Sequence, residues 1–276
     1  MPRPQPTPLP FHARPAVIGM VHLPPLPGAP RGPHEMGAVL ERARRDAAVL
    51  RAGGVDGVLV ENYGDVPFFA ERVPAETVAA LTLAVAEVRS ECGDLPVGVN
   101  VLRNDASTAL GIAAATGASF VRVNVHTGAM TTDQGVIQGQ AAETLRLRDA
   151  LCPGVAILAD VHVKHATPPA GERLEDAAQD AWWRGLADGL IVSGSATAVQ
   201  TDPDRVARVA TAVPDAPIWI GSGATPENVS ELELAGASGF IVGSALRRHG
   251  RAGEPVELER VQAFIEAVAL CRGAGA

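Results

Sequence analysis

The stretch Pro217–Arg248, PIWIGSGATPENVSELELAGASGFIVGSALRR, contains two short apolar runs that each end in a glycine-rich turn. The first run, Ile218–Ile220, is followed by Gly-Ser-Gly, and the second, Phe240–Val242, by Gly-Ser. Between them, Thr225 and Pro226 resemble a helix cap followed by a proline in the first helical turn. The pattern predicts a strand–turn–helix–strand–turn unit whose turns present backbone N–H groups to an anion. The residues predicted to bind a phosphate there are Gly221, Ser222, Gly223, Gly243 and Ser244.

Six further apolar runs precede this unit, and a segment of helical period follows each of them. They are Val17–Val21, Gly57–Val60, Val97–Leu102, Phe120–Val125, Val155–Val161 and Leu190–Val192. Apolar strands that alternate with helices indicate a parallel sheet covered by helices, and a chain of 276 residues has the size of one (β/α)8 domain. We therefore predict an α/β fold, a single-domain (β/α)8 TIM barrel over residues 15–276. Residues 1–14, with proline at every second position from 2 to 10, are expected to form an extended, poorly ordered tail.

The composition argues against several classes of protein. The formal net charge of −8 disfavours nonspecific nucleic-acid binding, because that needs a basic surface. The three cysteines have no CxxC spacing, so they predict neither a disulfide framework nor a zinc site, and a reducing cytoplasm is expected. No apolar run approaches the roughly 18 residues of a membrane-spanning helix, so no integral membrane segment is predicted. The oligomeric state stays open.

Polar residues gather at the predicted carboxyl ends of the strands, which is where the active sites of this fold lie. These residues are His22, Glu61, Asn62, Asn100, Asn124, His126, Asp160, His162, Lys164 and Ser193. Because side chains alternate along a strand, Asp160, His162 and Lys164 are expected on one face. The orientation of the fourth strand stays open, since Arg122 has the same parity as Asn124 and an arginine inside a barrel is unusual.

Lys164 is the only lysine in a chain that contains 22 arginines. A lysine supplies a compact ammonium whose pKa can be lowered, which a guanidinium cannot do. The roles open to it are an anchor for phosphate or carboxylate, a general acid, or a Schiff-base nucleophile, and the alternative is a loop lysine left by chance. Glu61, at the end of an apolar run, is a candidate general base, with a structural carboxylate as the alternative.

Asp160 and His162 are candidates for an acid/base pair, and His126 for the same role. With Glu61 they could instead ligate a divalent metal, but no compact ligand motif supports this, so no cofactor is predicted. His22 is either a binding residue or a histidine of the following proline-rich turn. The candidate substrate-binding residues at the strand ends are His22, Asn62, Asn100, Asn124 and Ser193.

Some residues outside these positions also carry expectations. His12, His34 and His249 have the surroundings of surface residues. Arg247 follows the second glycine turn and either adds positive charge to the phosphate site or faces solvent. The segment Thr127–Gln140, rich in glycine, threonine and glutamine, is predicted to be a mobile lid.

Five stretches give the chain a family resemblance over about residues 16–250. They are Ile18–Gly28 (IGMVHLPPLPG), Gly54–Phe68 (GVDGVLVENYGDVPF), Gly98–Asp105 (GVNVLRND), Phe120–Gly128 (FVRVNVHTG) and Ala159–His165 (ADVHVKH). Together they resemble the BtpA/SgcQ family, which implies a (β/α)8 barrel of the ribulose-phosphate-binding type. The stretch that ends at Glu61 and the closing GFIVGSAL are also similar to tryptophan synthase α chains, and this similarity implies an acid/base role for Glu61. The name-giving member of the family is linked to photosystem I biogenesis in cyanobacteria, while other members occur in organisms without photosynthesis.

Two hypotheses of function follow. The first is an enzyme that acts on a small phosphorylated metabolite, such as a sugar phosphate, by acid/base chemistry: isomerisation, epimerisation or C–C or C–N lysis. The second, implied by the resemblance, is an accessory factor for the biogenesis of a membrane protein complex. A net charge of −8 would be repelled by anionic lipid, and the sequence shows no clear amphipathic segment. The sequence therefore favours the enzyme.

Overall fold

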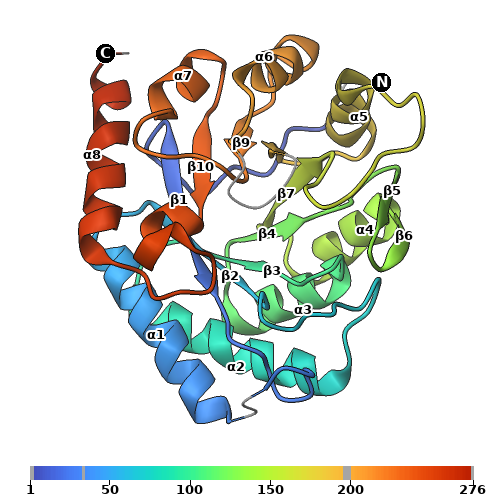
Figure 1. Ribbon diagram of the computed structural model, residues 1–276. Coiled ribbons are helices and arrows are strands. Elements are labelled where there is room, and N and C mark those ends of the chain that lie inside the picture. Colours follow the sequence, from blue (N-terminus) through green and yellow to red (C-terminus); the bar gives the residue numbers. More distant parts are fainter. Residues whose placement is uncertain (1–2, 33–34, 195–199, 275–276) are drawn as a thin grey trace.

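Eight parallel strands close into a barrel that helices surround (Figure 1). The computed structural model describes residues 3–32, 35–194 and 200–274. The strand order β1-β10-β9-β8-β7-β4-β3-β2 places each barrel strand next to its neighbours in sequence, which confirms the predicted single-domain (β/α)8 TIM barrel. The barrel strands are β1 Ala16–His22, β2 Gly57–Glu61, β3 Val97–Asn100, β4 Phe120–Val123, β7 Ala156–Val161, β8 Gly189–Val192, β9 Ile218–Ile220 and β10 Gly239–Val242.

The helices lie between the strands and after the last one. They are α1 Met36–Ala52, α2 Ala75–Cys92, α3 Ala106–Thr116, α4 Ala141–Leu151, α5 Leu174–Gln179, α6 Pro203–Ala212, α7 Val229–Leu234 and α8 Leu258–Ala274. The start of α7 differs from the prediction, because Asn228 closes a turn ahead of the helix. The backbone N–H of Thr225 donates to Asn228 Oδ1 at 2.8 Å, and Asn228 Nδ2 donates to the carbonyl of Gly223 at 2.9 Å. The expectation that Thr225 caps a helix is therefore wrong.

The segment predicted to be a lid contains an antiparallel hairpin of two short strands, β5 Ala129–Thr132 and β6 Gly135–Gln138. Its inner face packs in a small apolar cluster with Val125 and Val163. Thr131 and Thr167 exchange backbone hydrogen bonds of 2.9 and 2.8 Å, which attach the hairpin to the loop after β7. The hairpin thus lies beside the mouth of the barrel, and its mobility stays a prediction.

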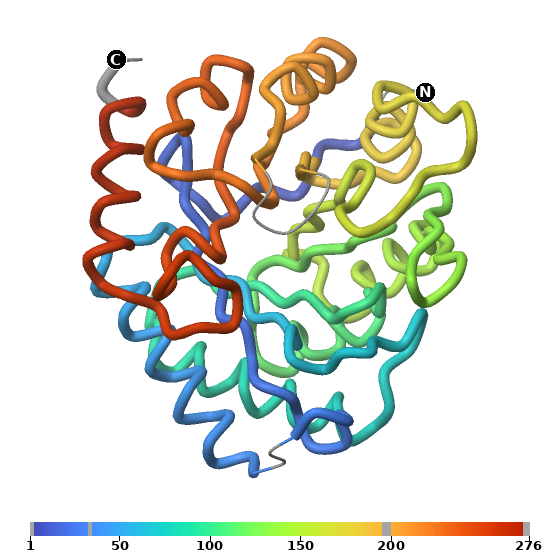
Figure 2. The backbone as a smooth tube through the Cα atoms, in the orientation of Figure 1, coloured from blue at the N-terminus to red at the C-terminus, as the bar shows by residue number. Residues whose placement is uncertain are grey.

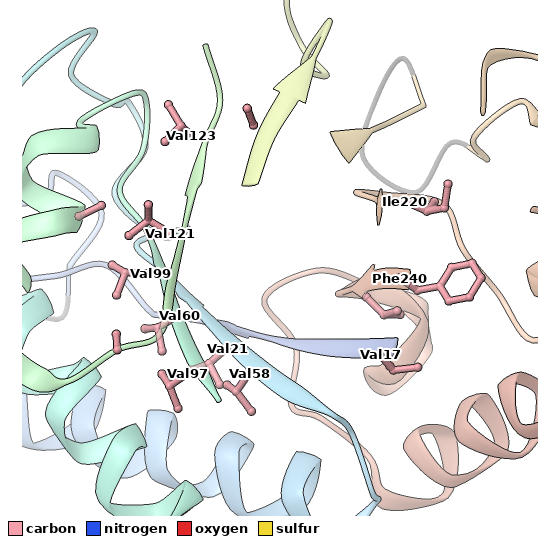
Figure 3. Close-up of a cluster of buried hydrophobic side chains, with 14 of the residues drawn as sticks. Val17, Val21, Val58, Val60, Val97, Val99, Val121, Val123, Ile220 and Phe240 are labelled. Carbon is pink, nitrogen blue, oxygen red and sulfur yellow. The ribbon is translucent and has the colours of Figure 1, made fainter. Parts of the chain in front are cut away.

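Side-chain alternation along the strands separates two apolar layers. Outward side chains pack against the helices, where β-branched residues fit the pleated surface. Figure 3 labels ten of this outer layer: Val17, Val21, Val58, Val60, Val97, Val99, Val121, Val123, Ile220 and Phe240. Inward side chains fill the lower barrel, among them Ile18, Met20, Leu59, Phe120, Leu158, Ile191, Trp219 and Ile241. Both layers are almost fully buried, so the hydrophobic effect specifies which face of each strand points inward.

The inward parity continues into a polar upper layer. Three polar residues lie two positions after an inward apolar residue of the same strand, so their side chains also point inward. They are Glu61 after Leu59 on β2, Arg122 after Phe120 on β4 and Asp160 after Leu158 on β7. Arg122 therefore lies inside the barrel, which settles the orientation of the fourth strand. The reason that the barrel holds an arginine is its partner, Asp160, described below.

Residues 3–14 form neither helix nor strand, but they run across the amino-terminal end of the barrel (Figure 2). The ring of Phe11 lies with its centroid 5.2 Å from that of Phe120 and 5.0 Å from that of Trp219, below the inner apolar layer. The backbone N–H of Thr7 donates to Asp188 at 2.7 Å, and the Arg3 guanidinium lies over the ring of Trp182. The tail thus closes the base of the barrel with an aromatic side chain.

Candidate functional site

Two cavities open side by side at the carboxyl ends of the barrel strands. The nest lobe, of about 330 Å³, lies over β9, β10 and the turns that follow them. The side lobe, of about 390 Å³, is lined by residues of the loops after β2, β3, β4 and β7. Glu61, Tyr63, Arg122 and Lys164 line both lobes. The mouth of the barrel is therefore one bipartite site with these four side chains at its junction.

The nest lobe contains all five residues predicted to bind a phosphate. Four backbone N–H groups on its wall have no acceptor within the described part of the chain: those of Gly223, Ala224, Ser244 and Ala245. Gly221 is sterically required, since a Cβ there would lie 2.5 Å from both Ile191 Cγ2 and Ser193 Oγ. The two turns thus present backbone donors to the same space, as the sequence predicted, and a tetrahedral oxyanion is the ligand that such a nest suits.

Lys164 reaches the junction from the loop after β7, and its side chain is partly buried. Burial lowers the pKa of Lys164, the guanidinium of Arg122 lowers it further, and the carboxylates of Glu61 and Asp160 act in the opposite direction. The neutral amine is therefore more accessible here than at an ordinary lysine.

Glu61 ends β2 and is almost fully buried at the junction. Its Oε1 atom lies 3.9 Å from Nε2 of His22, whose ring stacks on Tyr63 at a centroid distance of 4.5 Å. Burial, and next the positive charge of Arg247, hold the pKa of His22 well below its ordinary value, so the imidazole is neutral. Burial and the Glu61 carboxylate raise the pKa of Tyr63. Glu61 is thus a carboxylate at the edge of an open cavity, and no lysine or arginine of the described residues lies within ion-pair distance of it.

Asp160 lies deeper than Glu61 and is bound on several sides. Arg122 donates two hydrogen bonds of 2.8 Å to its two oxygens, one from Nε and one from Nη2. Asn124 Nδ2 donates a third at 3.2 Å, and Ser193 Oγ lies 3.5 Å from Oδ1. Asn100 extends the network by donating to Asn124 Oδ1 at 3.0 Å. This network holds the planar guanidinium of Arg122 in place beneath the junction. Both oxygens of Asp160 accept hydrogen bonds within the network.

Six predicted site residues line neither lobe. Asn100, Asp160 and Ser193 belong to the network just described, and Asn62, His126 and His162 have other partners. The ring of His126 is buried against the helical segment after β7, with Nε2 2.8 Å from the carbonyl of Gly185. His162 follows the end of β7 with φ of +52°, which breaks the strand alternation, so its ring turns to Glu172 (Nε2 to Oε2, 3.0 Å). The two residues line a small cavity that shares Asn124 with the side lobe. Asn62 joins two loops by accepting from the backbone N–H of Leu102 at 2.7 Å. The structure thus brings Glu61 and Lys164 together but not the two imidazoles.

The side lobe is also lined by residues that were not predicted as site residues, among them Tyr63, Phe68 and Leu102, and by Arg103, which the sequence placed just beyond the third strand without assigning it a role. Arg103 is 6% exposed, and its Nη2 donates to the backbone carbonyl of Lys164 at 2.7 Å, so it holds the lysine loop in place. All four lie in loops two or more residues beyond the end of a strand, where alternation no longer predicts the direction of a side chain. The feature of the sequence that could have indicated them is the presence of aromatic and basic residues in the loops after β2 and β3.

The remaining predicted residues have these surroundings. Arg247 is fully buried and donates to Asp46 Oδ2 at 3.0 Å and to the carbonyl of Met20, so the alternative that it faces solvent is wrong. It does not line the nest lobe, but its positive charge acts on His22, which does. His12 and His249 are exposed, and His34 lies outside the described residues. Within the described residues, no three His, Cys, Asp or Glu side chains are grouped to hold a metal ion.

The family model for the BtpA family matches residues 13–270. The chain belongs to the BtpA family. It is 49% identical over 259 residues to the photosystem I biogenesis protein BtpA of Synechocystis sp., with 94% of this chain and 90% of the relative covered. It is 45% identical over 258 residues to an uncharacterised protein of Thermococcus kodakarensis, covering 93% and 95% of the two chains. The solved structure of a thiamine phosphate pyrophosphorylase from Pyrococcus furiosus has the same fold, with a TM-score of 0.59, 13% identity and coverage of 92% and 96%.

All five stretches that carry the BtpA resemblance reach the mouth of the barrel. The first contributes His22, the second Glu61 and the fourth Arg122. The third contributes Arg103 and the fifth Lys164. Among the described residues, no helix is long and apolar enough to cross a membrane.

Proposed function

We propose that this BtpA-family chain is an enzyme that moves protons on a phosphorylated small molecule. The observation that carries the proposal is that Glu61 and Lys164 stand at the junction of the two lobes, one of which is walled by unpaired backbone donors. A phosphate in the nest lobe would place the next few atoms of the ligand at that junction. Positioning of this kind is a large part of enzymatic rate acceleration.

In this proposal Glu61 is the acid/base residue. It is buried at the rim of the cavity with no described lysine or arginine within ion-pair distance, so it is free to accept a proton from carbon or oxygen. Lys164, when protonated, stabilises the negative charge that develops on the substrate. Asp160, whose oxygens are committed to Arg122 and Asn124, acts as a positioning residue, a narrower role than the acid/base one predicted from the sequence. Isomerisation, epimerisation and lysis next to a carbonyl all need this set of groups.

The side lobe provides room for a ligand larger than a simple sugar phosphate. Val66, Phe68 and Leu102 give it an apolar wall, while Arg103 and Asn124 supply polar groups. Each lobe alone reaches the lower end of the volume range of about 300–1,000 Å³ for small-molecule sites. A ligand that fills both lobes carries a phosphate at one end and a partly apolar group at the other. The name of the solved neighbour, thiamine phosphate pyrophosphorylase, refers to a phosphorylated compound and supports this reading.

The test is a thermal-shift comparison of ribose 5-phosphate, inorganic phosphate and ribose on the wild type, Ser244→Asp and Ser244→Asn. Ser244 lines the nest lobe, and the two variants differ by one charge at nearly equal volume. A ligand at 100 times its Kd stabilises a protein by about 2.7 kcal/mol. We expect the phosphate compounds to raise the Tm of the wild type and of Ser244→Asn but not of Ser244→Asp. A shift that is equal in both variants, or no shift with any phosphate compound, contradicts the proposal.

The name of the Synechocystis relative supports a second candidate, an accessory role in the biogenesis of a membrane protein complex. The relative from Thermococcus kodakarensis, at 45% identity, carries no such name, so this role rests on the name of one relative. If no phosphate compound stabilises the chain, the second candidate becomes the better one.

A further inference from the structure

Lys164 is the one cation at the junction whose charged group is uncommitted within the described part of the chain. Arg122 is paired with Asp160, and Arg103 donates to the backbone of the lysine loop. The Nζ atom of Lys164, in contrast, makes no hydrogen bond and no ion pair with any described residue. An ammonium that only anchored the fold would be expected to have a fixed anionic partner.

The surroundings of Lys164 favour its neutral form. The charged groups that face it are two guanidiniums, Arg122 and Arg103, and two carboxylates, Glu61 and Asp160, of which Asp160 is itself neutralised by its pair with Arg122. Burial and the guanidiniums together lower the pKa of Lys164. A neutral amine is a nucleophile, while an ammonium is not. Arginine could supply positive charge here, as it does at 22 other positions, but it could not supply a nucleophilic amine.

We propose that Lys164 is a covalent catalyst that forms an imine with a carbonyl carbon of the substrate. This inference rests on the proposed function, since the phosphate in the nest lobe brings the carbonyl to the junction. The Nζ lone pair bonds to the carbonyl carbon while the C=O π electrons move to oxygen, and one of the two nitrogen protons passes to that oxygen to give a carbinolamine. The Glu61 carboxylate takes the second nitrogen proton and delivers it to the hydroxyl, and water leaves as the C=N bond forms. Amine and carbonyl thus become imine and water, with no oxidant or reductant.

The imine at Lys164 would activate the adjacent bonds of the substrate. Once protonated, it attracts the electron pair of an adjacent C–H or C–C bond, so Glu61 can remove the proton on the neighbouring carbon and leave an enamine. Reprotonation at another position gives isomerisation, and cleavage of the C–C bond gives lysis. Hydrolysis of the imine by water returns the amine of Lys164 and releases the product.

The test uses two aromatic aldehydes, pyridoxal 5′-phosphate and pyridoxal, purely as probes. They differ by the phosphate that the nest lobe is proposed to hold. Each is incubated with the full-length chain, the imine is reduced with sodium borohydride, and the labelled peptide is found by mass spectrometry. Because Lys164 is the only lysine of the sequence, the α-amine of Met1 in a protein expressed from this sequence serves as an internal reference.

We expect pyridoxal 5′-phosphate to label Lys164 ahead of the Met1 amine, and Lys164→Arg to abolish that label. Ser244→Asp is expected to slow labelling by the phosphorylated probe about tenfold, equivalent to about 1.4 kcal/mol, and to leave labelling by pyridoxal unchanged. The label on Lys164 is expected to appear with an apparent midpoint at lower pH than for a free lysine, whose pKa is about 10.4.

The outcomes separate this inference from the proposed function. If the phosphorylated probe raises the Tm but labels only Met1, the phosphate site stands and the imine is overturned. If both probes label Lys164 equally in the wild type and in Ser244→Asp, the reactive amine stands and the phosphate site falls. If neither probe stabilises the chain or labels Lys164, both proposals fail.

Discussion

Arg122 and Asp160 form a bidentate ion pair inside the barrel, with side chains only 2% and 0% exposed. The two residues lie on adjacent strands, β4 and β7, and both follow an inward apolar residue. Removing two charges from water is costly, and the mutual attraction offsets that cost only where the geometry is good and the other oxygens are bonded. Both conditions are met here, since Asn124 also donates to Asp160.

The first prediction concerns this pair. Asp160→Asn keeps the shape of the side chain but leaves the Arg122 charge uncompensated, so we expect a loss of about 3–5 kcal/mol in the free energy of unfolding. Asp149→Asn is the control, because Asp149 pairs with Arg148 while its side chain is 70% exposed. We expect the control to cost less than about 1 kcal/mol. Urea unfolding measures both, and equal effects for the two variants would show that the buried charge is solvated in some other way.

The second prediction concerns acid stability through His22. Burial and nearby cations hold the pKa of His22 well below its ordinary value, so the unfolded chain binds a proton there that the folded chain does not. The stability contributed by neutral His22 is present above the unfolded pKa of about 6.5 and is lost as the pH falls below it, at up to about 1.4 kcal/mol per pH unit. We expect His22→Gln to lose less stability than the wild type between about pH 6.5 and 5.5.

Urea unfolding at several pH values measures this difference. His249→Gln, at an exposed histidine, is the control and is expected to follow the wild type. Parallel pH curves for the wild type and His22→Gln would mean that His22 does not remain neutral in the folded state.

The barrel and the convergence of its last two glycine turns on one cavity could be predicted from the sequence, because both depend on local patterns. Apolar runs that end in Gly-Ser-Gly and Gly-Ser predict strands followed by tight turns from neighbouring residues alone. The alternation of side chains along a strand correctly predicted that Glu61 and Asp160 point into the barrel. Lys164 also lies in the mouth, although β7 ends three residues before it. Alternation failed where strands end: His162 takes a positive φ and turns away.

The parts that the sequence did not predict depend on long-range contacts. The charge of Arg122 is tolerated because of a carboxylate 38 residues away, a pairing that no periodicity reveals. Arg247 is buried by contact with Asp46, 201 residues away. The side lobe is assembled from loops after four different barrel strands, so its shape is a product of the closed barrel rather than of any one segment.

The third prediction concerns the amino-terminal tail. Phe11 packs against Phe120 and Trp219 at the base of the barrel, so Phe11→Ala is expected to lower the free energy of unfolding by about 1–3 kcal/mol, below the range for a fully buried phenylalanine because Phe11 is partly exposed. Phe11→Leu retains most of the apolar volume and should cost less. Chemical unfolding gives the comparison. A change within about 0.5 kcal/mol for Phe11→Ala is the result expected of a disordered tail, and it would contradict the docked one.

The fourth prediction concerns the side lobe. If the ligand fills both lobes, a nucleotide such as uridine 5′-monophosphate should bind more tightly than ribose 5-phosphate, because its ring can pack on Phe68 while its phosphate occupies the nest lobe. Phe68→Ala is expected to weaken binding of the nucleotide about tenfold, equivalent to about 1.4 kcal/mol of lost aromatic contact, and to leave ribose 5-phosphate unaffected.

Phe69→Ala is the matched control for the fourth prediction, because Phe69 is the next residue, is 55% exposed and does not line the side lobe. Isothermal titration calorimetry of the three proteins with the two ligands gives the required affinities. If Phe68→Ala weakens both ligands equally, the effect is on the fold of the loop and not on the lobe. If the wild type binds both ligands with the same affinity, the side lobe does not take part in binding, and the substrate is limited to what the nest lobe and the junction with Glu61 and Lys164 can hold.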